Sequence, residues 1–453
     1  MKKLILIIIF TLFVLVSISD LFHPGLPITH DGQDHVARIA NFYQNLSEGN
    51  IVPRWAGNLN WGYGHPILEF LYPLPSYLAS FFHFFGFTLV DGVKLVFGIS
   101  FILSGIAMWV FIKELLNDDY AAFFASLLYV IAPYRFVDLY VRGAIGEHVA
   151  FIFPPLIFYF LLRLSRRCSP RYVVGGAFSF AGLILSHNAI TVMFLPLMFA
   201  YGFYLIFQCS DKKFFILNAL CLVLFGFGLS AFFLIPAFIE GKYTLRDIVT
   251  GGGEYLRSFV TWKDFLISTW SYGGSIALSK QIGYIQWVSV FGGIFSTTIL
   301  FRNKNKLWLL TLGSLIIFWI TLFLMTASSN PIWQTATILQ KFQFPWRFLS
   351  VTVFLAALMG GISLSTISNK YKKIGLLMLV VGLLISNKSY WHTNGFLNKP
   401  ESFYAGIYNG TTDTGESAPI WSVRFMEKRP KSKVEIIEGK GRVRGIKRTI
   451  IER

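Results

Sequence analysis

The chain has 453 residues, of which 54% are hydrophobic, 17% aromatic and only 14% charged, and its formal net charge is +17. Soluble proteins contain about 25% charged residues, so this composition excludes an ordinary soluble domain. The basic residues gather in short loops between apolar runs, which is the orientation signal of membrane proteins and argues against nucleic-acid binding. The three cysteines, Cys168, Cys209 and Cys221, have neither metal-ligand nor disulfide-framework spacing.

Apolar runs long enough to cross about 30 Å of hydrocarbon recur along the chain. Because an open sheet would leave backbone groups unsatisfied in lipid, we expect an all-α polytopic membrane protein. The first run lacks a small-x-small cleavage site before Asp20, so we interpret it as a retained span and not as a signal peptide. About eleven spans are predicted, at 4–21, 92–112, 119–134, 147–164, 171–186, 188–207, 214–237, 284–301, 306–326, 346–366 and 372–387.

One further apolar stretch, 66–85, contains Glu69 and three prolines within ten residues, which is a poor composition for a spanning helix. The basic loops all fall on the cytoplasmic side only if this stretch does not fully cross the membrane. We therefore predict a broken helix at the outer leaflet, a cytoplasmic N-terminus and an extracytoplasmic C-terminus. The basic loops that support this topology lie at residues 2–3, 163–171, 212–213, 302–306 and 370–373.

With this topology the long first loop, 22–91, faces outward and contains a predicted amphipathic helix at 34–46. The segment 135–146 is predicted as a second outer loop and 327–345 as a fourth. The third, 238–283, is long and contains three consecutive glycines, which suggests a lid. We divide the chain into a transmembrane domain, 1–387, and an extracytoplasmic tail, 388–453. Alternating residues from Val434 to Ile446 predict a small outer β element, a hairpin, in that tail.

The densest polar stretch is Ile28–Arg38, where the first span should leave the membrane. Asp31 and Asp34 are three residues apart at the start of a predicted helix, so both could point the same way. Each could simply cap that helix. Each could instead accept a proton or hold a divalent cation, for which His30 would add a nitrogen ligand.

Other polar residues are predicted on the same outer face. Glu69 lies among apolar residues, where a carboxylate indicates function unless it reaches the interface. Arg142 could bind a phosphate oxygen bidentately, or it could pair with Glu147. Glu147 could otherwise complete a metal or base site with Asp31. Three more residues could either pack at the interface or bind an anionic head group: His187, Lys341 and Arg347.

Several motifs resemble a bacterial membrane family labelled 6-pyruvoyl-tetrahydropterin synthase-related, a label that does not imply pterin chemistry. They are Arg142-Gly143-Ala144-Ile145-Gly146-Glu147, Ser186-His187-Asn188, Phe344-Pro345-Trp346-Arg347 and Glu416-Ser417-Ala418-Pro419-Ile420-Trp421. The order of elements resembles, more broadly, the GT-C superfamily of membrane glycosyltransferases. That order is an N-terminal helix, a long outer loop that opens with an acidic motif, about eleven spans and an outer C-terminal region.

The superfamily resemblance implies a polyprenyl-phosphate-linked sugar donor, an acceptor on the outer face of the bacterial inner membrane and often a divalent metal cation. Asp31 matches by position the carboxylate expected to act as the catalytic base or to orient the acceptor. However, Asp31-Gly32-Gln33-Asp34 is not a plain Asp-Glu or Asp-x-Asp motif, which leaves open the metal dependence and which aspartate acts. The absence of a P-loop or dinucleotide glycine signature predicts no nucleotide cofactor.

We therefore expect an integral membrane glycosyltransferase that transfers a sugar to an envelope acceptor, which could be a glycan, lipid or protein. The alternative is a non-enzymatic transporter or assembly factor for lipid-linked glycans, but transporters usually place charges inside spans and often contain inverted repeats. The expected catalytic residues are Asp31, Glu147 and Asp34. The expected substrate-binding residues are Arg142, Glu69, His187, Lys341 and Arg347. The expected metal ligands are Asp31, His30 and Glu147.

Overall fold

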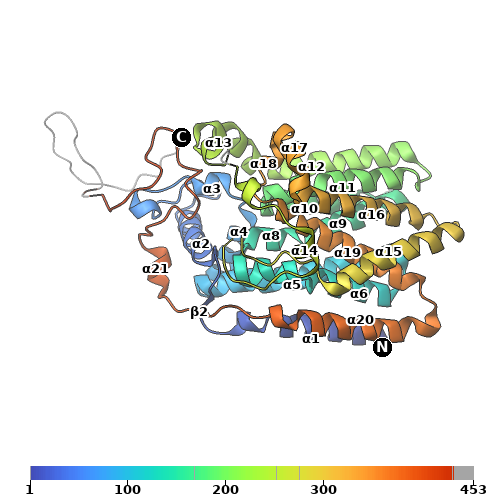
Figure 1. Cartoon of the computed structure of the whole chain (residues 1–453). Coiled ribbons are helices and arrows are strands. Elements are labelled where there is room, and N and C mark those ends of the chain that lie inside the picture. The colour runs from blue at the N-terminus through green and yellow to red at the C-terminus, as the bar shows by residue number, and fades with distance from the viewer. Residues whose placement is uncertain (1, 168, 251–252, 275, 431, 433–453) are drawn as a thin grey trace.

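The computed structural model describes residues 2–167, 169–250, 253–274, 276–430 and 432. Long helices lie side by side in one bundle, and the shorter elements α2, α3, α13, α21 and β2 gather at one end of it (Figure 1). The predicted hairpin at 434–446 lies outside the described residues. The mainly helical membrane architecture is confirmed.

Within the described chain, each predicted span coincides with a helix. Eight helical segments are long and apolar enough to cross a membrane, and the bent pair Asp119–Val130 and Pro133–Arg142 would make a ninth. The first and fifth predicted spans give shorter helices, of 16 and 17 residues, so the count of eleven stays a prediction. The helices are α1 (Lys2–Ser17), α5 (Leu89–Leu116), α6 (Asp119–Val130), α9 (Phe153–Arg166), α10 (Pro170–Ser186), α11 (Asn188–Ile206), α12 (Lys212–Glu240), α15 (Tyr284–Arg302), α16 (Leu307–Met325), α19 (Leu349–Thr366) and α20 (Asn369–Asn387).

The segment predicted as the second outer loop is helical and buried. Beyond α6 the chain bends by 47° at Pro133, and the short helix α7 (Pro133–Phe136) continues into a π-helical turn, η3 (Val137–Arg142). A further short helix, α8 (Ile145–Ala150), leads into α9. The loop prediction for 135–146 was wrong because the polar residues of this segment find partners inside the bundle: Asp138 and Arg142 pair with each other, and Arg135 donates to Ser104 of α5. π-Helical turns are frequent at functional sites.

The first loop contains the predicted amphipathic helix, which is α2 (Gly32–Ser47). The stretch 66–85 forms two helices, α3 (Ile67–Phe70) and α4 (Leu74–Phe84), separated at Pro73. The 11 residues of α4 extend only about 16 Å at 1.5 Å per residue, too short to cross the hydrocarbon core. The predicted break is confirmed, whereas its place at the outer leaflet stays a prediction.

The described part of the tail runs back across the first loop. The strand β2 (Phe396–Leu397) pairs antiparallel with β1 (Leu26–Pro27), and α21 (Glu401–Ala405) follows it. Residues 404–421, which we call the tail strap, then reach the segment 238–283. There the Leu245 N–H donates to the Ala418 carbonyl oxygen at 2.9 Å. This segment contains the short helices α13 (Arg246–Thr250) and α14 (Trp262–Leu266), and its action as a lid stays a prediction.

Candidate active site

The acidic turn before α2 is hydrogen-bonded directly onto the turn after η3. The backbone N–H groups of His30 and Asp31 donate to the carbonyl oxygens of residues 141 and 142, each at 2.9 Å. Gly143 has φ +67°, and a Cβ atom there would lie 2.3 Å from the Thr29 hydroxyl oxygen. Only glycine allows both this left-handed backbone and this approach. Segments more than 100 residues apart are therefore held together by their backbones.

The two aspartates of the acidic turn have different surroundings. Asp31 occupies the N-cap position of α2, but its side chain makes no capping hydrogen bond, and the residue is half-buried. Asp34 accepts a hydrogen bond from the Tyr408 hydroxyl at 2.8 Å. Burial raises the pKa of the Asp34 carboxyl, although the Arg38 guanidinium and this bond oppose the rise. Asp31 therefore does not cap α2 through its side chain, and its carboxylate is available to accept a proton.

A second polar group lies buried behind this turn, around Glu147. One Glu147 oxygen, Oε1, is 2.7 Å from Arg142 Nη2, 3.1 Å from Arg347 Nε and 3.8 Å from His187 Nε2. The other, Oε2, accepts a hydrogen bond from the Tyr134 hydroxyl at 2.8 Å. Both oxygens are occupied by donors and the side chain is fully buried. The predicted pairing with Arg142 is therefore present, and the prediction that Glu147 acts as a base or metal ligand disagrees with this geometry.

Arg142 is fully engaged in this group, which we call the Glu147 cluster (Tyr134, Asp138, Arg142, Glu147, His187 and Arg347). Arg142 Nη1 donates to Asp138 Oδ1 at 2.6 Å, and the guanidinium lies 4.7 Å from the centre of the Trp346 ring. Arg142 therefore has less capacity for a phosphate than predicted. Sequence reasoning missed Asp138 and Tyr134, although the four-residue spacing of Asp138 and Arg142 was a usable signal for a helical ion pair.

Arg347 is the more accessible of the two arginines in the Glu147 cluster. Its side chain is 15% exposed, against 8% for Arg142. Its Nη1 donates to the Phe342 carbonyl oxygen at 2.9 Å, while its Nε contact with Glu147 lacks the geometry of a hydrogen bond. A guanidinium that is ion-paired through one edge can present the remainder to an anion.

Tyr72 packs against the Glu147 cluster. Its ring centre lies 4.8 Å from that of His187, and a Cβ atom at Gly146 would come within 2.1 Å of the Tyr72 ring. Glycine at 146 therefore permits the approach. Burial raises the pKa of Tyr72 to about 12. Four charged side chains act on the same hydroxyl: Arg38, Glu147, Asp31 and Arg347.

The tail strap is fastened to the acidic helix and to the loop behind it. Arg38 Nε donates to the Thr412 hydroxyl at 2.8 Å, and His65 Nε2 lies 3.1 Å from Asp413 Oδ1. Burial alone would raise the pKa of Asp413, but the contact with His65 and the backbone N–H groups of residues 415 and 417 hold it below its usual range. No sequence pattern predicted these long-range contacts.

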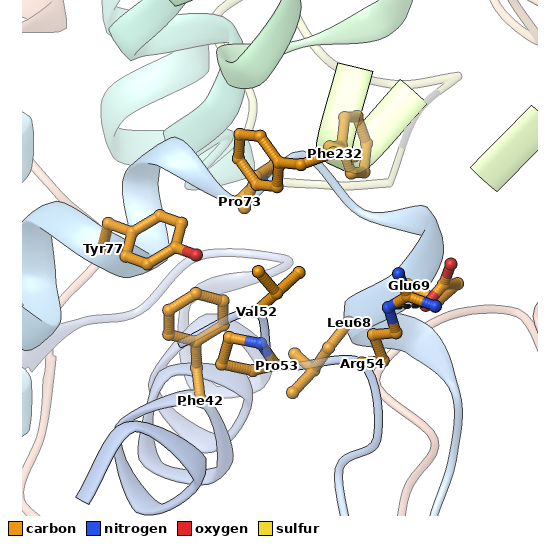
Figure 2. A pocket seen from close by; sticks show the side chains of 10 residues that line it. Phe42, Val52, Pro53, Arg54, Leu68, Glu69, Pro73, Tyr77 and Phe232 are labelled. Atoms are coloured by element: carbon orange, nitrogen blue, oxygen red, sulfur yellow. Dashed lines mark ion pairs between the residues drawn. The ribbon is translucent and has the colours of Figure 1, made fainter. Parts of the chain in front are cut away.

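Of the remaining predicted site residues, Lys341 and Glu69 lie apart from the acidic turn and the Glu147 cluster, whereas His30 belongs to the acidic turn itself. Lys341 pairs with Asp247 at 2.9 Å, and both side chains are mostly exposed. Glu69 pairs with Arg54 in a separate cleft (Figure 2). His30 is exposed, with its Nε2 3.2 Å from a backbone carbonyl oxygen.

The predicted metal ligands are not assembled. Among the described residues, no group of three or more His, Cys, Asp or Glu side chains could hold a metal ion. His30, Asp31 and Glu147 fail as a set because the Glu147 oxygens face arginine and tyrosine donors. A requirement for a metal stays a prediction, without ligands in this structure to support it.

Comparison with known proteins gives a family. Residues 68–393, well over half of the chain, match the model of the 6-pyruvoyl-tetrahydropterin synthase related domain, described as a membrane protein. An uncharacterized protein from Lactococcus lactis subsp. cremoris is 26% identical over 265 residues, which are 55% of this chain and 42% of that protein. The chain thus spans less than half of this relative.

Solved structures share the fold. The Archaeoglobus fulgidus oligosaccharyltransferase aligns with a TM-score of 0.52 and 14% identity, over 94% of this chain and 62% of that one. The mycobacterial arabinofuranosyltransferase AftD aligns with a TM-score of 0.55 and 15% identity, over 87% of this chain and 29% of that one. Identities this low show the fold alone. The chain therefore belongs to the 6-pyruvoyl-tetrahydropterin synthase related family of membrane proteins and has the fold of GT-C membrane glycosyltransferases.

Proposed function

We propose that the protein is a membrane glycosyltransferase that transfers a sugar from a polyprenyl-phosphate-linked donor to an acceptor on the outer face of the bacterial inner membrane. The observation that carries the proposal is the position of Asp31. Its side chain makes no capping hydrogen bond, and the residue is half-buried. Its backbone N–H is hydrogen-bonded to the Arg142 carbonyl oxygen. The fold supports the same class of reaction, because its solved neighbours are glycosyltransferases.

The proposed reaction is a displacement at the anomeric carbon of the donor sugar. The acceptor hydroxyl oxygen bonds to that carbon, the bond from the carbon to the phosphate oxygen breaks, and Asp31 takes the hydroxyl proton. The polyprenyl phosphate leaves with the bonding electron pair. Cations placed where this negative charge develops lower the barrier most. Arg347 fits that role, because its guanidinium is paired with Glu147 through Nε and is still partly exposed.

Glu147 has a positioning role in this scheme. By pairing with Arg142 and Arg347, it fixes the direction in which the Arg347 guanidinium can meet the leaving phosphate. Asp34 has a supporting role, because its bond to Tyr408 joins the acidic helix to the tail strap. No step is assigned to a metal, since the residues predicted to bind one are not brought together.

Transfer can be tested with the purified full-length protein in lipid nanodiscs. Radiolabelled sugars on polyprenyl phosphate serve as donors, and membranes from cells lacking the protein supply the acceptor. We expect wild-type protein to transfer label from one donor, and Asp31→Asn to lower the rate by about 100-fold or more. Asp247→Asn, which alters an exposed carboxylate, is the matched control and should transfer normally. Failure with every donor, or full activity of Asp31→Asn, would contradict the proposal.

A further inference from the structure

A narrow cleft lies outside the candidate active site, where the first loop meets α12. Figure 2 shows its polar pair, Arg54 and Glu69, at one side and the aromatic rings of Phe42 and Tyr77 at the other. The other lining residues are apolar: Val52, Pro53, Leu68, Pro73, Phe232 and Phe233. The cleft therefore combines an apolar wall with one charged end.

The Glu69 carboxylate at the charged end lacks hydrogen-bond donors. The Glu69 side chain is only 4% exposed, and neither of its oxygens makes a hydrogen bond. Its ion pair with Arg54 Nε, at 3.2 Å, leaves the half-exposed guanidinium also facing Glu240 at 3.9 Å. Buried polar groups normally have hydrogen-bond partners, and these two oxygens without such partners lie at a cleft. Both oxygens of a nearly buried carboxylate thus lack N–H or O–H donors, which favours a ligand that carries such donors and a positive charge.

The cleft also opens beside a surface suited to lipid. The segment Lys212–Tyr243, which contains α12, has the length and hydropathy of a membrane span, and little of it is buried in the bundle. Phe232 lines the cleft while being partly exposed itself, and Ile235 and Phe238 are exposed on the following turns. An amphiphile lying along this face would thus bring its head group to the Arg54–Glu69 pair.

We propose that this cleft binds a phospholipid whose head group contains a primary amine. The ammonium group supplies three N–H donors and a positive charge to Glu69, and the lipid phosphate contacts the exposed part of Arg54. One hydrocarbon chain lies against Phe232 and the apolar wall. The inference does not depend on glycosyl transfer, because none of the residues of the Glu147 cluster lines the cleft.

Lipid binding by the unaltered protein gives the first test. Full-length protein is titrated with phosphatidylethanolamine, phosphatidylcholine or phosphatidylglycerol of identical acyl chains, and bound lipid is counted by native mass spectrometry. Phosphatidylcholine has a cation without N–H donors, and phosphatidylglycerol has no cation. We expect one phosphatidylethanolamine to bind about tenfold more tightly than either of the others. Equal binding of the three lipids would overturn the proposal.

Three variants test whether the preference for phosphatidylethanolamine arises in this cleft. Glu69→Gln should abolish the preference for phosphatidylethanolamine, since a neutral amide cannot neutralise the ammonium. Arg54→Gln should weaken all three phospholipids and keep their order. Glu254→Gln, which alters an exposed carboxylate outside the cleft, should change nothing. Elution as a single species in gel filtration confirms that each variant is folded. An unchanged preference in Glu69→Gln would contradict the site.

Discussion

Two clusters at opposite ends of the Ile145–Arg166 segment each combine one glutamate with two arginines. At one end Glu114 binds Arg163 at 3.0 Å and Arg166 at 2.8 Å. At the other end Glu147 binds Arg142 at 2.7 Å and Arg347 at 3.1 Å. The chemistry is the same, but the Glu114 side chain is 20% exposed and that of Glu147 is 0% exposed.

The difference in burial separates an orientation signal from a candidate site. A partly exposed ion pair keeps much of its hydration, so it contributes little to stability. Basic residues in such a loop are explained by the orientation of the chain in the membrane. A fully buried glutamate gives up its hydration and depends on its partners. Burial, and not residue type, therefore distinguishes the group that we connect with function.

The largest expected difference concerns stability. Glu147→Ala removes the counter-charge that buried Arg142 shares with the partly exposed Arg347, and we expect it to lower the free energy of unfolding by about 3–5 kcal/mol. Glu114→Ala should lower it by only about 0–1 kcal/mol. Thermal unfolding of the purified variants, followed by gel filtration after heating, measures both. Equal losses in the two variants would remove the distinction between the clusters.

A matched pair of cations tests the active-site side of the comparison. Arg347→Gln should lower the rate of sugar transfer by about 100-fold, because one cation beside the leaving phosphate is lost. Lys341→Gln, in the exposed pair with Asp247, should leave the rate within about twofold, since exposed ion pairs are weak. The nanodisc transfer assay measures both rates. Equal effects would mean that Arg347 only anchors its helix.

Two tyrosines give a smaller, purely structural version of the same comparison. Tyr134→Phe removes the hydrogen bond to buried Glu147, and we expect a loss of about 1.5–3 kcal/mol. Tyr172→Phe removes the hydrogen bonds that its hydroxyl accepts from Arg163 and Arg171 at the other end. Only about 0–1 kcal/mol should be lost, because these arginines are partly exposed and water can replace the hydroxyl. Unfolding curves of both variants measure the loss of unfolding free energy. A larger loss for Tyr172→Phe than for Tyr134→Phe would contradict the expectation.

The tail strap should respond to acid. The folded-state pKa of Asp413 is held below its ordinary 3.8 by His65 and two backbone N–H groups, despite burial. A depressed carboxyl pKa stabilises the fold above about pH 4, and this contribution is lost as the pH falls towards the folded-state value. Hydrogen exchange of residues 404–417 should therefore increase between pH 5 and pH 3.

A control variant assigns this acid response to the ion pair. In Asp413→Asn the titrating carboxyl is gone, so exchange of the same segment should be faster already at pH 5 and should depend little on pH after correction for intrinsic rates. If the unaltered strap shows the same protection at both pH values, the His65–Asp413 contact does not fasten it.

Much of the fold follows from local sequence signals. Hydropathy located the long helices, periodicity located α2, and the prolines around Pro73 predicted the break in 66–85. The π-helical turn at Val137–Arg142 was not predicted, because its polar residues imitate a loop until their partners are known. The pairing of β1 with β2 joins Leu26 to Leu397 and Pro27 to Phe396, near opposite ends of the described chain, and no local pattern encodes such a contact.

The candidate site was predictable only in part. Asp31, Arg142, Glu147 and Arg347 stand out because charged residues are rare beside apolar runs. Tyr72 does not stand out, since one more aromatic residue in an aromatic-rich stretch has no signal of its own. Its packing against His187 depends on the close approach that Gly146 permits. Between the two roles considered for Glu147, the structure favours pairing with arginine, and sequence spacing could not reveal how many donors would surround this carboxylate.

Envelope glycan composition in cells that carry Asp31→Asn tests the catalytic role of this carboxylate most directly, since neither donor nor acceptor need be known. Linkage analysis by mass spectrometry is compared among wild-type, deletion and Asp31→Asn cells. We predict that Asp31→Asn cells lack the same sugar linkage as deletion cells, although the variant reaches the membrane in wild-type amounts. A defect in deletion cells together with a wild-type glycan in Asp31→Asn cells would contradict that role.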